Sequence, residues 1–233
     1  MKTSFYCLAS DNLNIKFKNN HSKVMNYFGI KMNYDNRIIH HGIWIDQIMN
    51  ESKSDIIFFM DCDCVPMNKE IIDFSIKMCE NGYLVGNAQV SNHLKAKHVL
   101  FCAPSFMVIS KDYYQLIGKP SATNNYFSDI AQEFTREANK KELRTKMYFP
   151  DSFQEVPDCG MWRMAGYGYY GIGTIFNNSI YHLFQSSIGK YEPLFSTACD
   201  LIISGKFSEI ERKYDSKSEY RGVFKIENDH GNF

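Results

Sequence analysis

The sequence predicts an α/β fold with a mostly parallel central sheet and helices on both of its faces. Strand-like and helix-like segments alternate through the first half of the chain, which is typical of βαβ units. Residues 56–60 form a continuous apolar run, as expected for a parallel strand that is covered on both sides. Hydrophobic residues make up 44% of the 233 residues, which suits one sizeable core. We therefore expect one folded domain over residues 1–205 and a charged C-terminal tail over 206–233.

The elements of the first half follow from the spacing of apolar residues and from the residues that end helices. Four apolar residues that share one helical face indicate a helix over 42–52. Gly29 and Gly82 mark the ends of two further helices. The other elements expected here are strands over 3–9, 30–34, 55–60 and 83–90, a polar loop over 10–20, and helices over 22–28 and 68–81.

The second half is expected to continue the alternation less regularly. A strand over 99–109 should be interrupted at Pro104, because proline cannot donate a hydrogen bond to a neighbouring strand. A helix over 128–140 begins at Ser128, a residue type that commonly caps helices. The remaining expected elements are a helix over 111–117, a strand over 143–149, a strand-like run over 174–184 and a final helix over 191–204.

Residues 160–173 are expected to form a loop rich in glycine and tyrosine. Its core, residues 166–173, reads Gly-Tyr-Gly-Tyr-Tyr-Gly-Ile-Gly. Glycine permits a mobile backbone, and tyrosine offers a flat apolar face with a hydroxyl group. Two interpretations stay open, namely a lid that closes over a substrate and excludes water, or a flexible connection or strand bend without such a role.

The composition argues against several classes of protein. Basic and acidic residues balance at 26 each, so the bulk charge gives no support for a dedicated nucleic-acid binder. The apolar runs are strand-sized, and the first residues lack the apolar core of a signal peptide. The seven cysteines, an odd number, lie mostly in apolar surroundings and indicate reduced thiols. We therefore expect a cytoplasmic protein without a transmembrane segment.

Two carboxylates, Asp61 and Asp63, directly follow the apolar run at 56–60. Residues two apart in extended backbone point to the same side, so both can face one cation. Carboxylates that close repel each other unless a cation neutralises them, and oxygen ligands favour Mg²⁺ or Mn²⁺. Such a cation can bridge the oxygens of a diphosphate. The alternative is that both residues are ordinary turn residues at the end of a strand.

Residues 54–66, Ser-Asp-Ile-Ile-Phe-Phe-Met-Asp-Cys-Asp-Cys-Val-Pro, resemble the Asp-x-Asp segment of glycosyltransferases with the GT-A fold. The order of the elements around this segment is similar as well, over roughly residues 3–200. The resemblance implies a single GT-A-like domain that uses Mn²⁺ or Mg²⁺ and a nucleoside-diphosphate sugar as donor. The acceptor would be the hydroxyl group of a glycan, a protein or another molecule, and a nucleic acid is not excluded.

The resemblance also implies roles for single residues. Asp63 would be the main metal ligand, Asp61 would contact the metal or the donor ribose, and His182 would be a distant third ligand. His182 can equally be a histidine without a ligand, since it stands between Tyr181 and Leu183.

Asp129 matches the position of the catalytic base that inverting members of the family place near an acceptor-side helix. A base there would take the proton of the acceptor hydroxyl as that group attacks the anomeric carbon. Glu133, one helical turn further on, is a substitute candidate. The alternative is that Asp129 only stabilises the first turn of its helix.

Polar residues at the ends of the first two strands are candidates for donor binding. Ser10, Asp11 and Asp35 can bond to the base or ribose, and His41 can approach the diphosphate. Trp44 can pack near the base, although a tryptophan on an apolar helix face more often belongs to the core.

The sequence leaves two other functions open. A sugar-nucleotide pyrophosphorylase also combines an α/β sheet with acidic metal ligands. Such an enzyme normally has a glycine-rich phosphate loop after its first strand, where this chain has no glycine before Gly29. A carbohydrate-binding module without catalytic activity would need no buried pair of carboxylates.

Overall fold

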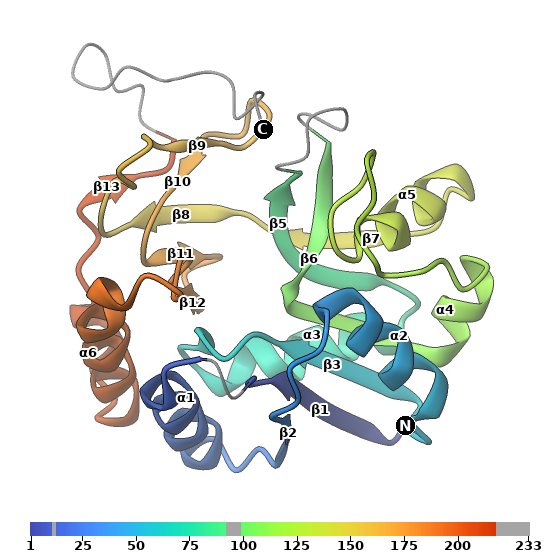
Figure 1. Cartoon of the computed structure of the whole chain (residues 1–233), viewed down its shortest axis with the longest axis horizontal. Coiled ribbons are helices and arrows are strands. Elements are labelled where there is room, and N and C mark those ends of the chain that lie inside the picture. The colour runs from blue at the N-terminus through green and yellow to red at the C-terminus, as the bar shows by residue number, and fades with distance from the viewer. Residues whose placement is uncertain (11–12, 92–98, 218–233) are drawn as a thin grey trace.

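The computed structural model of the chain describes residues 1–10, 13–91 and 99–217, and a six-stranded sheet forms its centre (Figure 1). The strand order is β2-β1-β3-β6-β5-β7, and within the described residues β6 alone runs antiparallel to the others. The strands are β1 (Thr3–Leu8), β2 (Met32–Asp35), β3 (Ile56–Met60), β5 (Leu84–Val90), β6 (Leu100–Ser110) and β7 (Thr145–Tyr148). The expected α/β fold with a mostly parallel sheet is confirmed.

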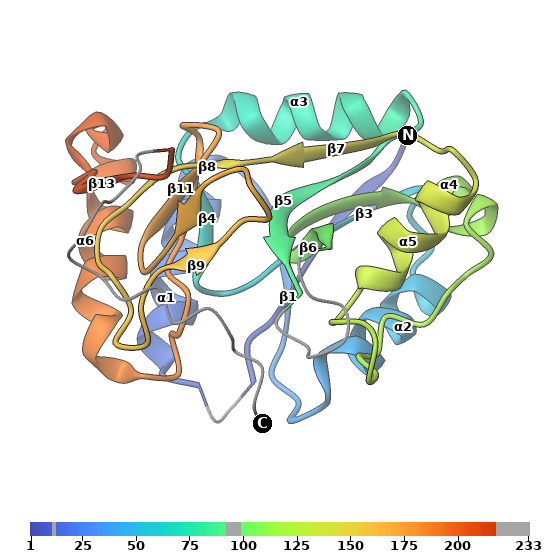
Figure 2. The same cartoon turned by 90° about the horizontal axis from the view of Figure 1, so that it is seen from above.

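Helices cover both faces of this sheet (Figure 2). Their bounds are α1 (Ile15–Tyr27), α2 (His41–Glu51), α3 (Lys69–Glu80), α4 (Lys111–Leu116), α5 (Gln132–Lys140) and α6 (Glu192–Ile203). The strand β3 is fully buried, and its side chains alternate between two cores. Ile57 and Phe59 pack with α2, α4 and α5, whereas Phe58 and Met60 pack with α3. Burial on both faces explains why β3 is apolar throughout.

A second sheet, which the sequence did not predict, lies beside the first. Its order is β13-β8-β11-β12-β4, and all of its described pairs are antiparallel. The strands are β4 (Cys64–Pro66), β8 (Pro150–Phe153), β11 (Thr174–Phe176), β12 (Ile180–His182) and β13 (Tyr214–Asp215). Because β4 follows β3 after a short turn, the chain passes directly from the first sheet into the second at residues 61–63.

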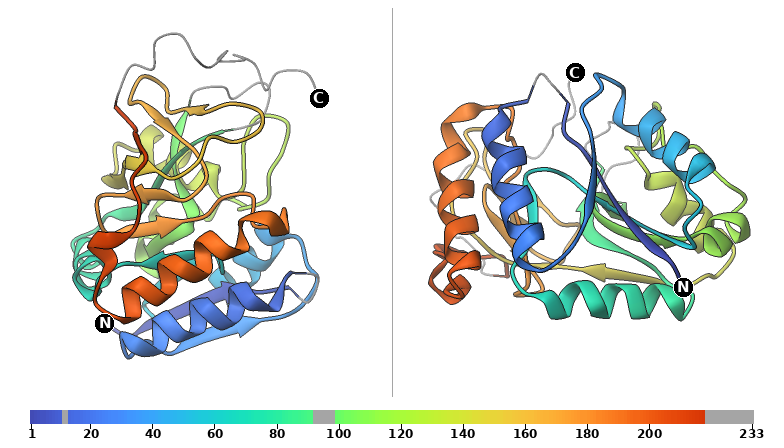
Figure 3. Two further views of the ribbon diagram at one scale, coloured as in Figure 1. Left: turned by 90° about the vertical axis from the view of Figure 1, so that its left-hand side faces the viewer. Right: turned by 90° about the horizontal axis from the view of Figure 1, so that it is seen from below.

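Helices α1 and α6 lie side by side against the second sheet (Figure 3). The Phe17 and Phe195 rings pack with centroids 5.4 Å apart. At the edge of this contact the Lys16 ammonium forms an ion pair of 3.0 Å with Glu192. This helix pair joins an early segment of the chain to a late one, and both pack on the same core as β12.

Two expectations for the first half and middle of the chain are wrong. The polar stretch at 10–20 is not all loop, because α1 begins at Ile15 after Asn14, whose side chain accepts a hydrogen bond from the Lys16 amide. Phe17 gives this polar helix its buried anchor. Strand β6 runs through Pro104 without a break. The bulge opposite Gly86 leaves Pro104 without a partner on β5, so its missing donor costs no hydrogen bond.

Three expectations for the later chain are also corrected. Helix α5 begins at Gln132 instead of 128, and Ser128 is buried in an isolated β-bridge instead of capping the helix. The strand-like run at 174–184 is two strands, β11 and β12, joined by a tight turn. The segment at 160–173 contains a small hairpin, β9 (Trp162–Arg163) and β10 (Tyr169–Tyr170).

The expected tail begins within the described residues. Residues 206–217 contain the 3₁₀ helix η2 (Phe207–Glu209) and the strand β13, which pairs with β8. A second 3₁₀ helix, η1 (Gly189–Tyr191), precedes α6.

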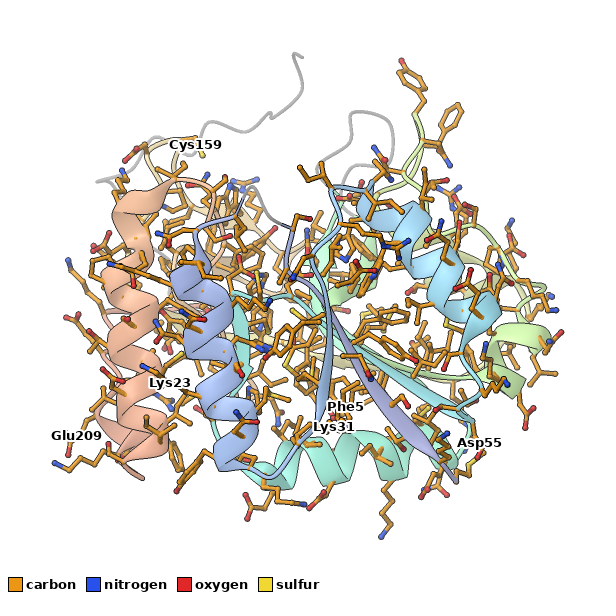
Figure 4. All side chains as sticks on the ribbon, turned by 60° about the horizontal axis from the view of Figure 1, so that its bottom comes forward. Phe5, Lys23, Lys31, Asp55, Cys159 and Glu209 are labelled. Atoms are coloured by element: carbon orange, nitrogen blue, oxygen red, sulfur yellow. The ribbon has the colours of Figure 1, made fainter. Side chains whose placement is uncertain are left out.

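All seven cysteines lie in the described residues and are free thiols. Cys159 is exposed and lies near the end of the molecule opposite Asp55, which precedes β3 (Figure 4). None of the helices in the described part of the chain combines the length and the apolarity that crossing a membrane requires.

Candidate metal site

The Asp61-x-Asp63 segment forms the turn between the two sheets. The Asp61 amide donates a hydrogen bond of 3.0 Å to the Ser105 carbonyl of β6, which fixes the end of β3. The Asp61 carbonyl then accepts a hydrogen bond of 3.0 Å from the Cys64 amide, which closes the turn. Both carboxylates therefore leave the backbone within one hydrogen-bonded turn at the carboxyl end of a central strand, where open α/β sheets bind ligands.

His182 reaches this turn through the pairing of β12 with β4. It stands opposite Cys64 in the antiparallel register, and the Leu183 amide donates a hydrogen bond of 3.0 Å to the Asp63 carbonyl. The His182 Nε2 atom lies 3.5 Å from the Asp63 Oδ1 atom. Backbone pairing thus brings a late residue of the chain beside the carboxylates.

The three side chains form a cluster with the composition of a metal site. One possible ligand atom from each of Asp61, Asp63 and His182 lies within 4.8 Å of the other two. The cluster is recessed, because the side chains are 31%, 11% and 6% exposed in that order. The His182 Nδ1 atom is buried and has no hydrogen-bond partner among the described residues, so the polar contact of the ring is on its carboxylate side. Two carboxylates and an imidazole suit Mn²⁺ or Mg²⁺, with the imidazole favouring Mn²⁺.

The two carboxylates have opposite pKa shifts. Burial and the nearby Asp63 charge raise the pKa of Asp61, although His41 and His182 act against this shift. Burial also acts to raise the pKa of Asp63, but attraction to His182 and hydrogen bonds from His182 and Ser186 outweigh it, so that this pKa is lowered. The site therefore favours the ionised form of Asp63 and disfavours that of Asp61. A bound cation would stabilise both carboxylates in their ionised form.

Two residues of this site were missed by the sequence analysis. The Phe184 ring covers the His182 ring with centroids 3.8 Å apart. Phe184 and Gln185 both have left-handed backbone, with φ values of 47° and 57°, so the chain turns sharply after β12. This turn brings the Ser186 hydroxyl into a hydrogen bond with Asp63. The sequence holds no local signal for this role, because the turn is built from residues that rarely adopt its conformation.

His41 approaches the cluster from helix α2. Its Nε2 atom lies 3.6 Å from the Asp61 Oδ1 atom, and its ring centroid is 5.6 Å from that of Trp44. Trp44 is 1% exposed and belongs to the core, in line with the packing interpretation. Its indole N–H donates a hydrogen bond of 3.1 Å to Asp35 Oδ2. A series of contacts therefore connects Asp35 through Trp44 and His41 to Asp61.

The other expected donor-binding residues lie around the ends of β1 and β2. Asp35 is bound by the Arg37 guanidinium, whose Nη2 atom is 2.5 Å from Asp35 Oδ2, and this hydrogen bond lowers the pKa of Asp35. The Ser10 hydroxyl donates to the Arg37 carbonyl at 3.0 Å. Asp11 lies outside the described residues.

Asp129 lies outside the cluster of three, in the turn that leads into α5. Its Oδ1 atom accepts a hydrogen bond of 2.8 Å from the Ile130 amide, and its own amide donates one of 2.7 Å to Gln132. Burial, and after it the charge of Asp129, raises the pKa of Tyr170 on β10. Asp129 is thus close enough to the β9–β10 hairpin for its charge to act on Tyr170. Glu133, the substitute candidate, forms an ion pair of 2.8 Å with Arg136.

A buried histidine, His21 of α1, lies near the site. Its Nδ1 atom is 2.7 Å from the Tyr34 hydroxyl, and its Nε2 atom is buried without a partner among the described residues. Burial lowers the pKa of His21 from 6.5 to about 4, although the Asp63 charge acts in the opposite direction. His21 is therefore neutral in the folded protein at neutral pH.

We predict that His21 makes the folded state less stable in acid. The unfolded chain takes up a proton near pH 6.5 and the folded chain only near pH 4, so stability falls as the pH drops through this window. Between pH 7 and pH 5 the loss should be about 2 kcal/mol. His21→Gln should reduce the change in unfolding free energy, measured by urea titration at both pH values, by that amount. His40→Gln, at an exposed histidine, is the control, and equal pH dependence in all three proteins would contradict the prediction.

We also predict that Ser186 holds Asp63 in position for metal binding. Ser186→Ala removes the hydroxyl that bonds to Asp63 and should weaken Mn²⁺ binding about tenfold, as is usual when a partner of a ligand is lost. Titration calorimetry with Mn²⁺ measures this without any assay of activity. Ser187→Ala is the matched control, because Ser187 is exposed. An unchanged affinity in Ser186→Ala would show that the hydrogen bond has no part in binding.

No protein-family model matches the sequence, and no curated protein matches it either. Several solved structures have a similar chain path. A197 from STIV is 16% identical with a TM-score of 0.44, over 63% of this chain and 81% of that one. The apo form of the glycosyltransferase GlyE of Streptococcus pneumoniae is 10% identical with a TM-score of 0.43, over 94% and 66%. The catalytic domain of Drosophila β1,4-galactosyltransferase 7, in complex with xylobiose, is 13% identical with a TM-score of 0.41, over 63% and 64%.

Proposed function

We propose that this chain is a metal-dependent glycosyltransferase that transfers a sugar from a nucleoside-diphosphate sugar to an acceptor hydroxyl group. The observation that carries the proposal is the cluster of Asp61, Asp63 and His182 at the carboxyl end of β3. A βαβ arrangement with β1 at the centre precedes this cluster, and parallel sheets of this kind bind nucleotides at the same edge. A pair of carboxylates is the ligand type that a cation bound to a diphosphate requires.

In this proposal Asp63, Asp61 and His182 hold Mn²⁺ or Mg²⁺. When bound, the cation supplies the positive charge that stabilises a departing nucleoside diphosphate. Asp63 is suited to be the main ligand, because its lowered pKa keeps it ionised. His182 fits a supporting role, since Phe184 holds its ring and Nε2 faces Asp63. Asp61, the most exposed of the three, is in the best position to contact both cation and donor.

The donor is expected to lie along the ends of β1 and β2. His41 would approach the diphosphate beside Asp61, and Asp35 and Ser10 would contact the base or the ribose. Arg37 already forms an ion pair with Asp35, so the binding of a ribose to Asp35 would require Arg37 to move or to share the carboxylate. Asp11 stays a candidate for the same role on the grounds given by the sequence.

Asp129 is proposed as the base that takes the proton of the acceptor hydroxyl, which would make the transfer inverting. One of its carboxylate oxygens accepts a hydrogen bond from the Ile130 amide, and its charge acts to raise the pKa of Tyr170 on the hairpin. The acceptor would then approach between the start of α5 and this hairpin. Glu133 is the weaker candidate, because its carboxylate is paired with Arg136.

We predict that Asp63→Ala abolishes nucleotide binding that depends on the metal while the fold stays intact. Loss of a hydrogen-bond partner of a metal ligand costs about 10- to 100-fold in affinity, so loss of the ligand Asp63 itself should weaken the Mn²⁺-dependent binding of a nucleoside diphosphate by at least about 100-fold. A thermal-shift screen of uridine, guanosine, cytidine and adenosine diphosphates with and without Mn²⁺ measures this, since a ligand of the folded state raises the melting temperature. Donor turnover should disappear in parallel.

Asp73→Ala is the matched control for that experiment. Asp73 lies on α3 with a side chain that is 60% exposed and pairs with Lys69, so its loss should leave binding unchanged. If Asp63→Ala keeps wild-type turnover, the metal assignment is wrong. Turnover of a nucleoside triphosphate with a sugar phosphate, and release of pyrophosphate, would support the nucleotidyltransferase alternative instead.

We predict that Asp129→Asn stops sugar transfer but leaves donor binding unchanged. An amide cannot accept the proton, and loss of a general base costs about 100-fold or more in rate. Transfer to an acceptor and binding of the nucleoside diphosphate should be measured on the same preparation. Asp112→Asn, at an aspartate in the first turn of α4, tests whether a helix-terminal charge matters by itself. Loss of donor binding in Asp129→Asn would make the residue structural.

A further inference from the structure

The glycine- and tyrosine-rich segment forms a fixed turn at the end of the β9–β10 hairpin. The Met164 amide donates a hydrogen bond of 2.8 Å to the Gly168 carbonyl, and the Tyr167 amide donates one of 2.7 Å to the Met164 carbonyl. Ala165, Gly166 and Gly168 all have positive φ values, so the backbone turns tightly around Tyr167. The Tyr167 side chain is 57% exposed. The turn therefore presents this tyrosine to solvent.

Contacts with the end of the described chain hold the turn in place. The Tyr169 amide donates a hydrogen bond of 2.8 Å to the Ser216 carbonyl. A side chain at Gly168 would have its Cβ atom only 2.1 Å from the Ser216 carbonyl oxygen, so the close approach requires glycine. These contacts fix the turn that carries Tyr167 without the help of a ligand.

Tyr167 forms one wall of an open pocket with a volume of about 500 Å³. The described residues that line it are Val99, Leu100, Asn139, Thr145, Met147, Phe149, Ala165 and Tyr167. Thr145, Met147 and Phe149 alternate along and just beyond β7, so their half-buried side chains share one face and form the floor. Asn139, near the end of α5, also lines the pocket. In Figure 2 the hairpin lies beside the end of β5, next to this part of the sheet.

The chemistry of the lining identifies the class of ligand. None of the described residues that line the pocket is charged, so none of them offers an ionic partner to a phosphate or a carboxylate. The Tyr167 and Phe149 rings pack with centroids 4.9 Å apart and form an aromatic surface. Asn139, Thr145 and the Tyr167 hydroxyl add hydrogen-bonding groups around it. An aromatic surface with uncharged polar groups matches a sugar ring, which has an apolar C–H face and a rim of hydroxyl groups.

We propose that this pocket binds a neutral saccharide, with Tyr167 as the surface against which the sugar ring packs. The pocket shares no residue with the metal cluster. The assignment of this saccharide to the acceptor rests on the proposed function. With that assignment, the acceptor is a glycan or a glycoside. Binding of the sugar itself rests on the pocket alone.

Saturation-transfer NMR in EDTA, without nucleotide, tests the pocket separately from the metal site. The probes are the methyl glycosides of glucose, galactose, mannose, xylose and N-acetylglucosamine, with lactose, cellobiose and maltose. At least one should give signals on its ring protons, and methyl glucuronide should bind more weakly than its neutral counterpart. Tyr167→Ala should weaken the apparent affinity about tenfold.

Tyr27→Ala is the matched control. Tyr27 is 53% exposed and packs beside Phe28 at 5.0 Å, so it resembles Tyr167 in exposure and in aromatic contact but lies on α1. This variant should bind the probe like the wild type. Tyr167→Phe keeps the ring and should retain most of the affinity. If Tyr167→Ala is unfolded by circular dichroism, Asn139→Ala takes its place, with weaker binding expected.

Two results would overturn the proposal. One is the absence of a signal from every saccharide on the folded wild-type protein, and the other is equal binding by wild type and the pocket variants. Neither result bears on the nucleotide screen with Mn²⁺, which measures the metal site. Saccharide binding in a protein that fails the nucleotide screen would leave the pocket assigned and the transferase proposal refuted.

Discussion

The constraint on which the rest of the site depends is the short turn that carries two acidic side chains from one sheet into the other. Asp61 directly follows β3, which is fully buried, and Cys64 begins a strand of the second sheet. The turn leaves no room to separate the two carboxylates. Their mutual repulsion is offset by His41 of α2, by His182 of β12 and by the Ser186 hydroxyl.

The surrounding groups offset the repulsion unequally. His182 and Ser186 both contact Asp63, whereas among the described residues His41 is the one cationic side chain paired with Asp61 within 4.0 Å. The pKa values of the two acids therefore shift in opposite directions. This asymmetry is a physical reason to assign different roles to two residues that the sequence presents as equivalent. It also explains why the second sheet matters, since β12 delivers His182 and the turn after it delivers Ser186.

The local pattern of apolar residues predicted an element correctly where that pattern matched the faces that the element buries. The apolar run before Asp61 predicted β3, because a strand covered on both faces needs no polar side. The same logic failed where a distant contact decided the outcome. Helix α1 is polar along most of its length and is anchored by Phe17 against Phe195. Strand β6 continues through Pro104, because a bulge removes the partner whose hydrogen bond the proline could not make.

The sequence by itself determined the fold class and the position of Asp61 and Asp63, since strand alternation, a buried run and a two-residue spacing are all local features. Only the tertiary structure decided that His182 lies beside them, because its place depends on the register between β4 and β12. The same holds for Phe184, which covers His182, and for Ser186, which bonds to Asp63. It holds again for the pocket beside Tyr167, whose walls come from β7, α5 and a hairpin. Contacts between segments far apart in the chain leave no trace in the periodicity of either one.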